Sequence, residues 1–433
     1  MSLTPPAIVA LVFAALLGIA GEWSGALGAF PWWRLAVALL VIGVIAEFLL
    51  VRRRPLSARW HGADRLFLGR SETLELELDN PSAPSLTAQF APVLPDALAP
   101  ADQRTRTVAI PAGESRRARV AVRPVMLGSH PWPRLPVRVL GRLGLAWWPR
   151  RLDPPSELTV LPDTLGRRAA VTGSAEAGST AQSKLGGARE LHHLRGYQAG
   201  DPRHTIDWKA SARASRLITR VFSEDQHLEI VVMLDAGRTS RTEIDGMSQF
   251  GHYVNLAARF AEYCVAGDDR VGLVAFADRP LCVVAPGRGL AAVTRIRRAL
   301  AALEPRAVES DTLEAALRVR RLVRHRCLAV VLTDLYESSS TSRLAQTARL
   351  LAPKHLPMMI GLLGDDIGAL AGGEAREWLD PYRGLAAREY GRHVRANIAR
   401  LGELGALAMT ARPEELDRKV LSRYRLLRAQ HRV

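Results

Sequence analysis

Residues 228–239, LEIVVMLDAGRT, constrain the fold of this chain more than any other stretch. They form a continuous apolar run that ends in a carboxylate, a glycine and a hydroxyl, which is typical of a strand buried on both faces of a parallel sheet. Residues 327–335, CLAVVLTDL, repeat the pattern and end in Thr333 and Asp334. Because open α/β sheets bind ligands at the carboxyl ends of their strands, both runs bring oxygen atoms to one edge. Such an edge can build a site for a hard cation such as Mg²⁺.

Strands and helices alternate through the rest of the C-terminal half. Strands are predicted at 228–234, 270–277, 281–284, 327–333, 358–363 and 406–410, and helices at 248–266, 290–303, 313–323, 342–351, 385–401 and 413–430. Alternation of this kind predicts a parallel sheet with helices on both faces. We therefore expect residues 228–433 to form a doubly wound α/β domain.

Two apolar runs open the chain. Residues 7–20 continue with little charge until Glu22 breaks the run, and residues 35–51 contain only Glu47 as a charged residue. Each run can supply the roughly 20 residues of helix that span a bilayer. The sequence therefore predicts a transmembrane helical hairpin over residues 1–55. We interpret Glu47 as lying at the inner interface, where its side chain reaches the headgroups; a functional intramembrane acid is the alternative.

The arginines Arg52, Arg53 and Arg54 follow the second run directly. Positively charged residues stay on the cytoplasmic side of a membrane. We therefore expect a two-helix membrane protein with both termini and the bulk of the chain in the cytoplasm. A cleaved signal peptide is the rival interpretation of the first run, but no basic segment precedes it and a second span follows.

Short alternating segments occupy residues 56–155. Strands are predicted at 73–78, 104–110, 116–122 and 135–140, with proline and glycine turns between them. Repeated strands of this kind indicate a small antiparallel β-sandwich. We interpret Trp132, Trp147 and Trp148 as core or domain-interface packing, because large aromatic side chains dominate buried area; a ligand-binding surface is the alternative.

Residues 156–227 are predicted to hold a linker and an unusual segment. Residues 166–187 are rich in small residues and have no apolar period, as linkers do. The segment RGYQAGDPRHTIDWKASAR follows, with these polar and aromatic residues close together: Arg195, Tyr197, Asp201, Arg203, Asp207, Trp208 and Arg213. We expect an ion-pair network that pins the segment to the sheet, since buried charges are costly unless paired. An anion site is the alternative.

Composition limits the partners and the chemistry. The net charge is +16, and all but four of the 59 basic residues are arginine. A basic protein can meet nucleic acid, anionic lipid or an acidic protein. No basic stripe interleaved with aromatics marks a nucleic-acid groove, so nucleic acid is not the expected partner. The cysteines Cys264, Cys282 and Cys327 are widely spaced and predict free thiols in a reducing compartment.

Motifs for catalysis are absent from the sequence. It has no G-x-S-x-G elbow, no H-E-x-x-H pair and no phosphate-binding loop. We therefore expect neither an enzyme nor an ATPase.

Two motifs carry a family resemblance. Residues 235–239, with Asp311-Thr312 and Thr333-Asp334 downstream, resemble a von Willebrand factor type A domain. The segment RGYQAGDPRHTIDWKASAR, joined to that strand, is similar to the bacterial domain-of-unknown-function family 58, whose members resemble this chain along nearly its whole length. The resemblance implies a bacterial inner-membrane protein associated with MoxR-type AAA+ ATPases, and a role in assembling or remodelling other proteins.

The resemblance also implies a metal site. The type A pattern D-x-S-x-S, with a distant Thr and a distant Asp, matches the following residues: Asp235, Thr239, Thr312 and Asp334. Gly237 stands where the first Ser belongs, so one hydroxyl ligand is missing. A water can fill that position, because Mg²⁺ usually keeps several. The alternative is a vestigial cluster whose carboxylates cap helix N-termini or pair with Arg238.

These observations favour a membrane-anchored scaffold or adaptor whose type A-like domain binds a protein partner. Arg238 and Arg241 lie in the loop after the first buried strand and can grip a carboxylate of that partner in a bidentate way. The alternatives are a metal-dependent hydrolase and, from the charge alone, a binder of nucleic acid or anionic lipid.

Overall fold

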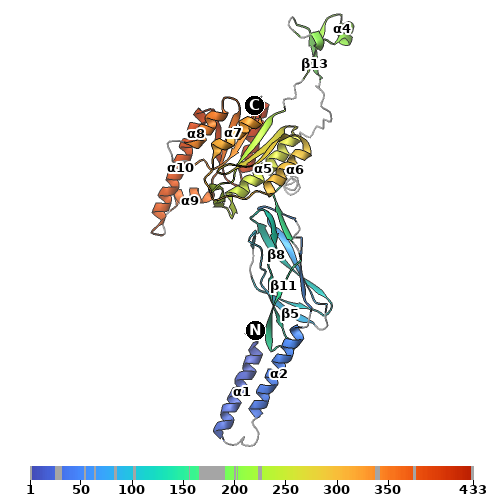
Figure 1. Cartoon of the computed structure of the whole chain (residues 1–433), viewed down its shortest axis with the longest axis vertical. Helices are drawn as coiled ribbons and strands as arrows, with labels where there is room; N and C mark the ends of the chain where they lie inside the picture. Colours follow the sequence, from blue (N-terminus) through green and yellow to red (C-terminus); the bar gives the residue numbers. More distant parts are fainter. Residues whose placement is uncertain are drawn as a thin grey trace.

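The computed structural model describes most of the chain, and the statements below concern these residues: 2–24, 32–52, 55–62, 65–81, 85–100, 104–155, 157–164, 191–198, 201, 203–222, 227–336, 342–373 and 377–430. The predicted linker at 166–187 lies outside them. The described residues form a pair of apolar helices, a β-domain, an α/β domain and a small separate hairpin (Figure 1).

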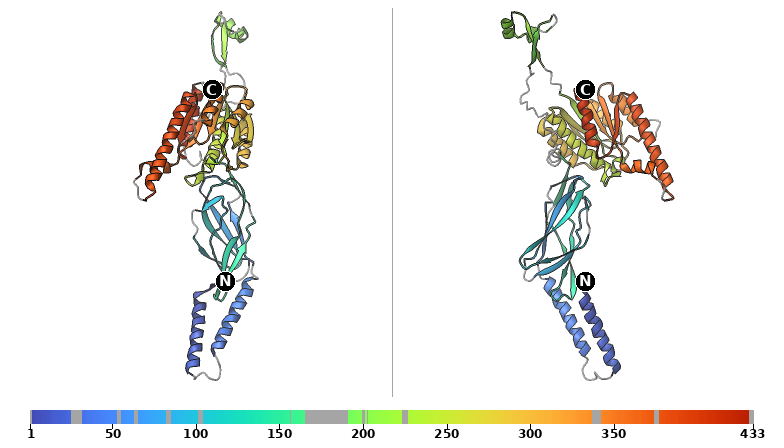
Figure 2. Two further views of the ribbon diagram at one scale, coloured as in Figure 1. Left: turned by 60° about the vertical axis from the view of Figure 1, so that its left-hand side comes forward. Right: turned by 180° about the vertical axis from the view of Figure 1, so that it is seen from behind.

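The two N-terminal helices, α1 (Pro5–Ser24) and α2 (Trp32–Arg52), lie side by side at one end of the molecule (Figures 1 and 2). The segment Arg34–Arg52 is long and apolar enough to cross a membrane, whereas the apolar stretch found in α1, Pro5–Leu16, is shorter. Large apolar side chains of both helices are exposed, for example Phe13 at 62% and Ile42 at 62%. Such exposure is typical of helices that face lipid, where no water has to be excluded.

The β-domain consists of twelve described strands. They are β1 (Ser2–Leu3), β2 (Ser57–His61), β3 (Arg65–Phe67), β4 (Glu72–Asp79), β5 (Leu86–Phe90), β6 (Leu98–Pro100), β7 (Arg106–Ile110), β8 (Ser115–Pro124), β9 (Gly128–Pro131), β10 (Leu135–Leu140), β11 (Ala146–Leu152) and β12 (Glu157–Leu161). They form sheets of order β1-β11-β10-β5-β7, β2-β4-β8-β6 and β3-β12-β9. The four predicted strands correspond to β4, β7, β8 and β10.

Alternation along β4 explains why its sheet has one buried face. Leu74, Leu76 and Leu78 are each at most 1% exposed, while the glutamates between them face outward. Two expectations need correction. The domain extends past residue 155, because β12 pairs with β3 and β9. The sandwich is also not wholly antiparallel, because β12 runs parallel to β3. These two strands are far apart in sequence, so no hairpin has to join them.

The tryptophans of the β-domain serve packing. Trp132 is 7% exposed and stacks on Trp60 with ring centroids 4.5 Å apart. Trp148 is 8% exposed and contacts Phe48 of α2, with centroids 5.2 Å apart. Trp147 is only half-buried, because it points to the other side of β11. Core packing is thus confirmed for Trp132, and interface packing against α2 for Trp148.

The α/β domain is built on a six-stranded sheet of order β19-β18-β15-β20-β21-β22. Its strands are β15 (Glu229–Asp235), β18 (Arg270–Phe276), β19 (Pro280–Gly287), β20 (Leu328–Leu332), β21 (Leu356–Leu362) and β22 (Leu407–Ala411). Its main helices are α5 (Gln249–Ala266), α6 (Gly289–Ala301), α7 (Thr312–Leu322), α8 (Arg343–Leu351), α9 (Asp365–Gly372), α10 (Asp380–Glu403) and α11 (Leu416–Ala429). A short hairpin of β16 (Glu243–Ile244) and β17 (Met247–Ser248) precedes α5.

Helices cover both faces of this sheet, as the alternation predicts. One hydrophobic core joins the sheet to α5, α6 and α11, and a second joins it to α7, α8 and α10. The expectation of a wholly parallel sheet is wrong at one edge. β19 is antiparallel to β18, because the short turn at 277–279 cannot make a crossover connection. Helix α9 was not predicted.

Buried polar contacts join the β-domain to the α/β domain. Asn255 on α5 donates from Nδ2 to the Leu68 carbonyl oxygen at 2.9 Å, and its Oδ1 accepts from the Asp163 backbone N–H at 2.9 Å. Arg259, one turn further along α5, pairs with the Asp163 carboxylate at 3.2 Å and with Asp417 at 2.8 Å. Breaking such a buried pair leaves a charge uncompensated, so this joint is stiff.

Glu47 joins α2 to the β-domain. Its side chain is 1% exposed, and its two carboxylate oxygens accept from the backbone N–H groups of Leu145 and Ala146, each at 3.2 Å. A side chain at Gly141 would overlap this carboxylate. The expectation that Glu47 reaches lipid headgroups is therefore wrong, because the turn between β10 and β11 lies against the helix and supplies the donors.

Candidate functional site

Asp235 ends β15 at the centre of the six-stranded sheet. The side chain is 1% exposed. Its Oδ1 accepts from the Gly237 N–H at 2.8 Å and from the Ser310 hydroxyl at 2.5 Å, and its Oδ2 accepts from the Thr333 hydroxyl at 2.6 Å. Burial raises the pKa of Asp235, while these hydrogen bonds act in the opposite direction. Three separate chain segments therefore meet on one carboxylate.

Gly237 explains why Ser310 can reach Asp235. A Cβ at residue 237 would overlap the Ser310 hydroxyl and would lie 2.9 Å from the Val308 carbonyl oxygen. The space that a serine side chain at position 237 would need is thus filled by Ser310 from the loop before α7. The hydroxyl that the sequence pattern lacks at 237 is supplied to Asp235 from another segment.

Asp334 follows β20 at the same edge. Its Oδ1 accepts from the Tyr336 N–H at 2.9 Å and from the Tyr390 hydroxyl of α10 at 3.2 Å. The rings of Tyr336 and Tyr390 stack with centroids 4.9 Å apart. Burial raises the pKa of Asp334, and the negative charge of Asp235 adds to the rise. The two carboxylates thus lie at the carboxyl ends of neighbouring strands.

The two predicted threonine ligands have different surroundings. Thr312 begins α7, is buried, and its hydroxyl accepts from the Thr347 hydroxyl of α8 at 3.0 Å. Thr239 is half-buried in a short 3₁₀ helix, and its neighbour Ser240 donates to the backbone oxygen of Asp235 at 2.8 Å. The described hydrogen bonds of Asp235 thus come from Ser310 and Thr333 rather than from the two threonines taken from the sequence pattern.

The donor set decides how well a cation fits this edge. Among the described residues, no group of three or more His, Cys, Asp or Glu side chains could hold a metal ion. A metal here would therefore depend on Asp235, Asp334, hydroxyls and water. Oxygen ligands of this kind suit Mg²⁺, and a cation would relieve the repulsion between the two carboxylates. Protein donors already engage both oxygens of Asp235, so such a cation would have to compete with them.

Helix N-termini at this edge are capped by other side chains. Asp311 accepts from the N–H groups of Leu313 and Glu314 at the start of α7, each at 3.0 Å. Asp235 does not pair with Arg238; that arginine pairs with Glu309 at 3.1 Å, and both side chains are mostly exposed. The vestigial-cluster alternative expects carboxylates that cap helix N-termini or pair with Arg238. Capping is observed for Asp311, whereas Arg238 pairs with Glu309.

The rim of this edge is basic. Arg238 is 64% exposed at its side chain, and Arg241 is exposed three residues later. Arg343, at the start of α8, lies 3.4 Å from an Asp311 carboxylate oxygen with 52% of its side chain exposed. Exposed ion pairs of this kind are worth little, typically below ~1 kcal/mol. A carboxylate on another molecule can therefore replace Glu309 as the partner of Arg238.

The unusual segment forms a separate hairpin with a helix in it. Its elements are β13 (Leu191–Gly196), a 3₁₀ turn (Arg203–Thr205), α4 (Trp208–Ala214) and β14 (Ile218–Phe222), and the two strands pair only with each other among the described residues. The unit stands apart from the six-stranded sheet in every view (Figures 1 and 2). Among the described residues, no strand pairing joins this unit to the six-stranded sheet, so the predicted pinning network is not seen there.

Local pairs hold this hairpin unit together. Arg195 donates to Asp201 at 2.7 Å, and the Gln198 N–H donates to the same carboxylate at 2.9 Å. The hydrogen bond from the Gln198 N–H, with help from Arg195, lowers the pKa of Asp201. Asp207 caps α4 by accepting from the Ala210 N–H at 3.0 Å. Trp208 is 67% exposed. Tyr197, Arg203 and Arg213 show no described contact that joins them to a network. Of the predicted network, Asp201 thus stabilises the turn after β13, and Asp207 caps the start of α4.

The described residues define a multidomain α/β protein with several antiparallel sheets and an apolar N-terminal helix long enough to cross a membrane. Residues 193–367 match the family described as "Protein of unknown function DUF58", so this part of the chain is a domain of that family. The match covers the hairpin unit and the α/β domain as far as α9. No curated protein matches the chain.

Solved structures show only distant likeness. "Conserved hypothetical protein BatB" of Bacteroides thetaiotaomicron is 13% identical over 47% of this chain and 99% of that chain, with a TM-score of 0.33. Salmonella alpha-2-macroglobulin reacted with methylamine is 18% identical over 25% of this chain and 7% of that chain, with a TM-score of 0.20. The CARDB domain of the PF1109 protein from Pyrococcus furiosus is 13% identical over 25% of this chain and 89% of that domain, with a TM-score of 0.16. Similarity at this level assigns no function.

Proposed function

We propose that this protein is a membrane-anchored scaffold or adaptor that presents the carboxyl edge of its C-terminal sheet to an acidic site on another protein. The observation that carries the proposal is the basic rim at that edge. Arg238, Arg241 and Arg343 are exposed around the buried Asp235. Guanidinium groups bind carboxylates in a bidentate way, and exchange of Glu309 for a partner carboxylate costs little.

Membrane anchoring is the second part of the proposal. In it, α1 and α2 both span the bilayer as a hairpin, tilted or locally adapted to its thickness. The arginines from Arg52 to Arg54 stay on the cytoplasmic side by the positive-inside rule, so both termini and the bulk of the chain are cytoplasmic. The exposed apolar surface of both helices supports this arrangement.

The identity of the partner follows from the family resemblance. The sheet order and the carboxylate at the end of the central strand support a von Willebrand factor type A-like domain. The resemblance implies a MoxR-type AAA+ ATPase as the partner, and assembly or remodelling of other proteins as the process. In this proposal the chain couples that soluble ATPase to clients at the membrane.

Co-purification from the native host tests the proposal. The double variant Arg238→Glu, Arg241→Glu reverses two exposed charges and leaves the buried Asp235 intact. Arg349→Glu, exposed in the last turn of α8 at the opposite end of the sheet, is the matched control. We expect wild type and control to retain the ATPase and the double variant to lose most of it. Equal recovery from all three would exclude this edge as the docking surface, and no ATPase in any sample would exclude the adaptor.

A metal-dependent enzyme is the second candidate. It is favoured by one observation: Asp235 and Asp334 lie at the carboxyl ends of neighbouring strands, and both are buried enough for their pKa values to be raised. Carboxylates with perturbed pKa values are found at functional sites. A rise in Tm with Mg²⁺ is expected of this candidate and tests its metal site.

A further inference from the structure

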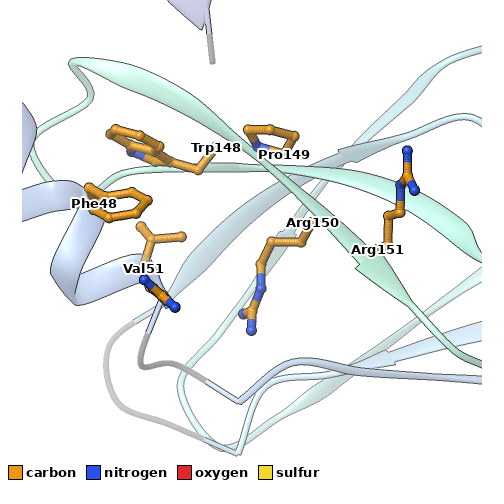
Figure 3. Close-up of a pocket in the computed structure, with 7 residues that line it drawn as sticks. Phe48, Val51, Trp148, Pro149, Arg150 and Arg151 are labelled. Carbon is orange, nitrogen blue, oxygen red and sulfur yellow. The ribbon is translucent and has the colours of Figure 1, made fainter.

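A pocket of about 460 Å³ lies where α2 meets the β-domain. Seven residues line it, three at the end of α2 and four in succession on β11: Phe48, Val51, Arg52, Trp148, Pro149, Arg150 and Arg151. Figure 3 shows the rings of Phe48 and Trp148 on one side of the pocket and the side chains of Arg150 and Arg151 further along β11. The pocket is thus apolar at one end and basic at the other.

The apolar end contains a polar atom without a partner. Trp148 is 8% exposed, and its Nε1 has no hydrogen-bond partner among the described residues. A buried donor left unpaired costs about 1–3 kcal/mol. Tryptophan at a membrane surface places its ring among apolar groups and donates its N–H to a polar neighbour.

Three guanidinium groups line the pocket. Arg52 lies 6.0 Å from the centroid of the Phe48 ring, and so stands beside the aromatic end, while Arg151 is exposed further along β11. Arg150 is half-buried, and burial lowers its pKa. None of the residues that line the pocket in the described part of the chain is acidic. The charges of the lining residues therefore favour an anion.

The position along α2 indicates where that anion comes from. Apolar side chains are exposed on α2 as far as Leu49 and Leu50, each at 49%, and Arg52 follows. One helical turn, ~6 Å along the axis, separates Phe48 from Arg52. With α2 in a membrane, Phe48 lies beside acyl chains and Arg52 at the level of the phosphates.

We propose that this pocket binds an anionic phospholipid of the bilayer. Its phosphate lies between Arg52 and Arg150, and the part of an acyl chain nearest the headgroup lies against Phe48 and Trp148. This inference rests on the membrane anchoring proposed above. A lipid is favoured over a free phosphate because only a lipid fills the aromatic end as well as the basic end. Bound there, the lipid fixes the depth at which the β-domain sits on the membrane.

Competition between two lipids tests the proposal with the full chain in detergent. Phosphatidylglycerol and phosphatidylcholine are offered in equal amounts, and retained lipid is measured by native mass spectrometry. We expect about a tenfold preference for phosphatidylglycerol. Both lipids carry a phosphate, but the choline cation of phosphatidylcholine is repelled by the arginines of the pocket. Arg52→Gln with Arg150→Gln should remove the preference, and Arg52→Gln alone, at an exposed position, should reduce it if the double variant does not fold.

The control and the remaining outcomes separate this proposal from its alternatives. Arg116→Gln with Arg119→Gln removes two exposed charges from β8 and should keep the preference. Equal retention of the two lipids by wild type, or an unchanged preference in the pocket variants, would overturn the lipid site. Displacement of the lipid by millimolar inorganic phosphate would show a free-anion site instead. Flotation with phosphatidylcholine vesicles tests the membrane anchor separately. A chain that floats but shows no lipid preference would support the anchor and exclude the lipid pocket. A chain that does not float would exclude both.

Discussion

Replacing Glu47 by glutamine should loosen the joint between α2 and the β-domain. The carboxylate accepts from two backbone N–H groups, those of Leu145 and Ala146, at 3.2 Å each. The amide of glutamine has one oxygen, so its NH₂ group would face one of the two donors. Hydrogen bonds to charged groups contribute about 1.5–3 kcal/mol each. Loss of one bond therefore lowers the free energy of opening by ~1.5–3 kcal/mol, which is about 10- to 150-fold in the opening equilibrium.

Native-state hydrogen exchange of the full chain in detergent measures this opening. We expect the amides of Leu145 and Ala146 to exchange about 10- to 150-fold faster in Glu47→Gln than in wild type. Glu157→Gln, at an exposed position on β12, is the control and should leave both rates unchanged. Equal protection of the two amides in wild type and Glu47→Gln would refute the reasoning, because the carboxylate would then contribute nothing to the joint.

Four further predictions concern topology, metal, packing and pH. A C-terminal fluorescent fusion should be active in the cytoplasm and a periplasmic phosphatase fusion inactive; the reverse would contradict the proposed orientation. Millimolar Mg²⁺ should raise the Tm of the chain and Asp334→Ala should abolish the rise; no rise in wild type would favour a vestigial cluster. Gly237→Ser should destabilise the chain by about 1–3 kcal/mol through overlap with Ser310, and adding Ser310→Gly should recover part of the loss in denaturant unfolding. Burial lowers the pKa of His355 to about 4, so its contribution to stability is present above the ordinary value of 6.5 and is lost as pH falls toward 4. Tm should therefore fall less over that range in His355→Leu than in wild type.

Much of the α/β domain could be predicted because its signals are local. Apolar runs at 228–234 and 327–333 mark β15 and β20, and periodic segments mark α5, α7 and α8. The direction of β19 could not be read from its own residues, since parallel and antiparallel strands share the same apolar pattern. The length of the turn at 277–279 was the signal for an antiparallel pair, because a turn this short cannot make the crossover that parallel strands need. Helix α9 was missed because two of its eight residues are aspartates and two are glycines, which leaves a weak apolar pattern.

The candidate site was predictable in outline only. Asp235 and Asp334 end neighbouring strands, so their shared edge follows from the sheet. The role of Ser310 depends on the space above Gly237, which is a tertiary property. A glycine at a serine position, with a serine beside Asp311-Thr312, was the available signal. Glu47 gave no such signal, since an acid within an apolar run has the same sequence pattern whether lipid or a protein turn surrounds it.

The turn between β10 and β11 is held on two sides, and this has a mechanical consequence. Thr4, just before α1, donates to the Gly144 carbonyl oxygen at 2.5 Å, while Glu47 of α2 holds Leu145 and Ala146. The N-terminal ends of the two contacts, Thr4 before α1 and Glu47 on α2, thus hold the same turn. At the other end of the β-domain, Asn255 and its neighbours hold the α/β domain in place. The β-domain is therefore a strut, which keeps the α/β domain at a fixed distance from the two helices. A pull on the α/β domain would travel down this strut as tilt of both helices rather than being absorbed in a flexible tether.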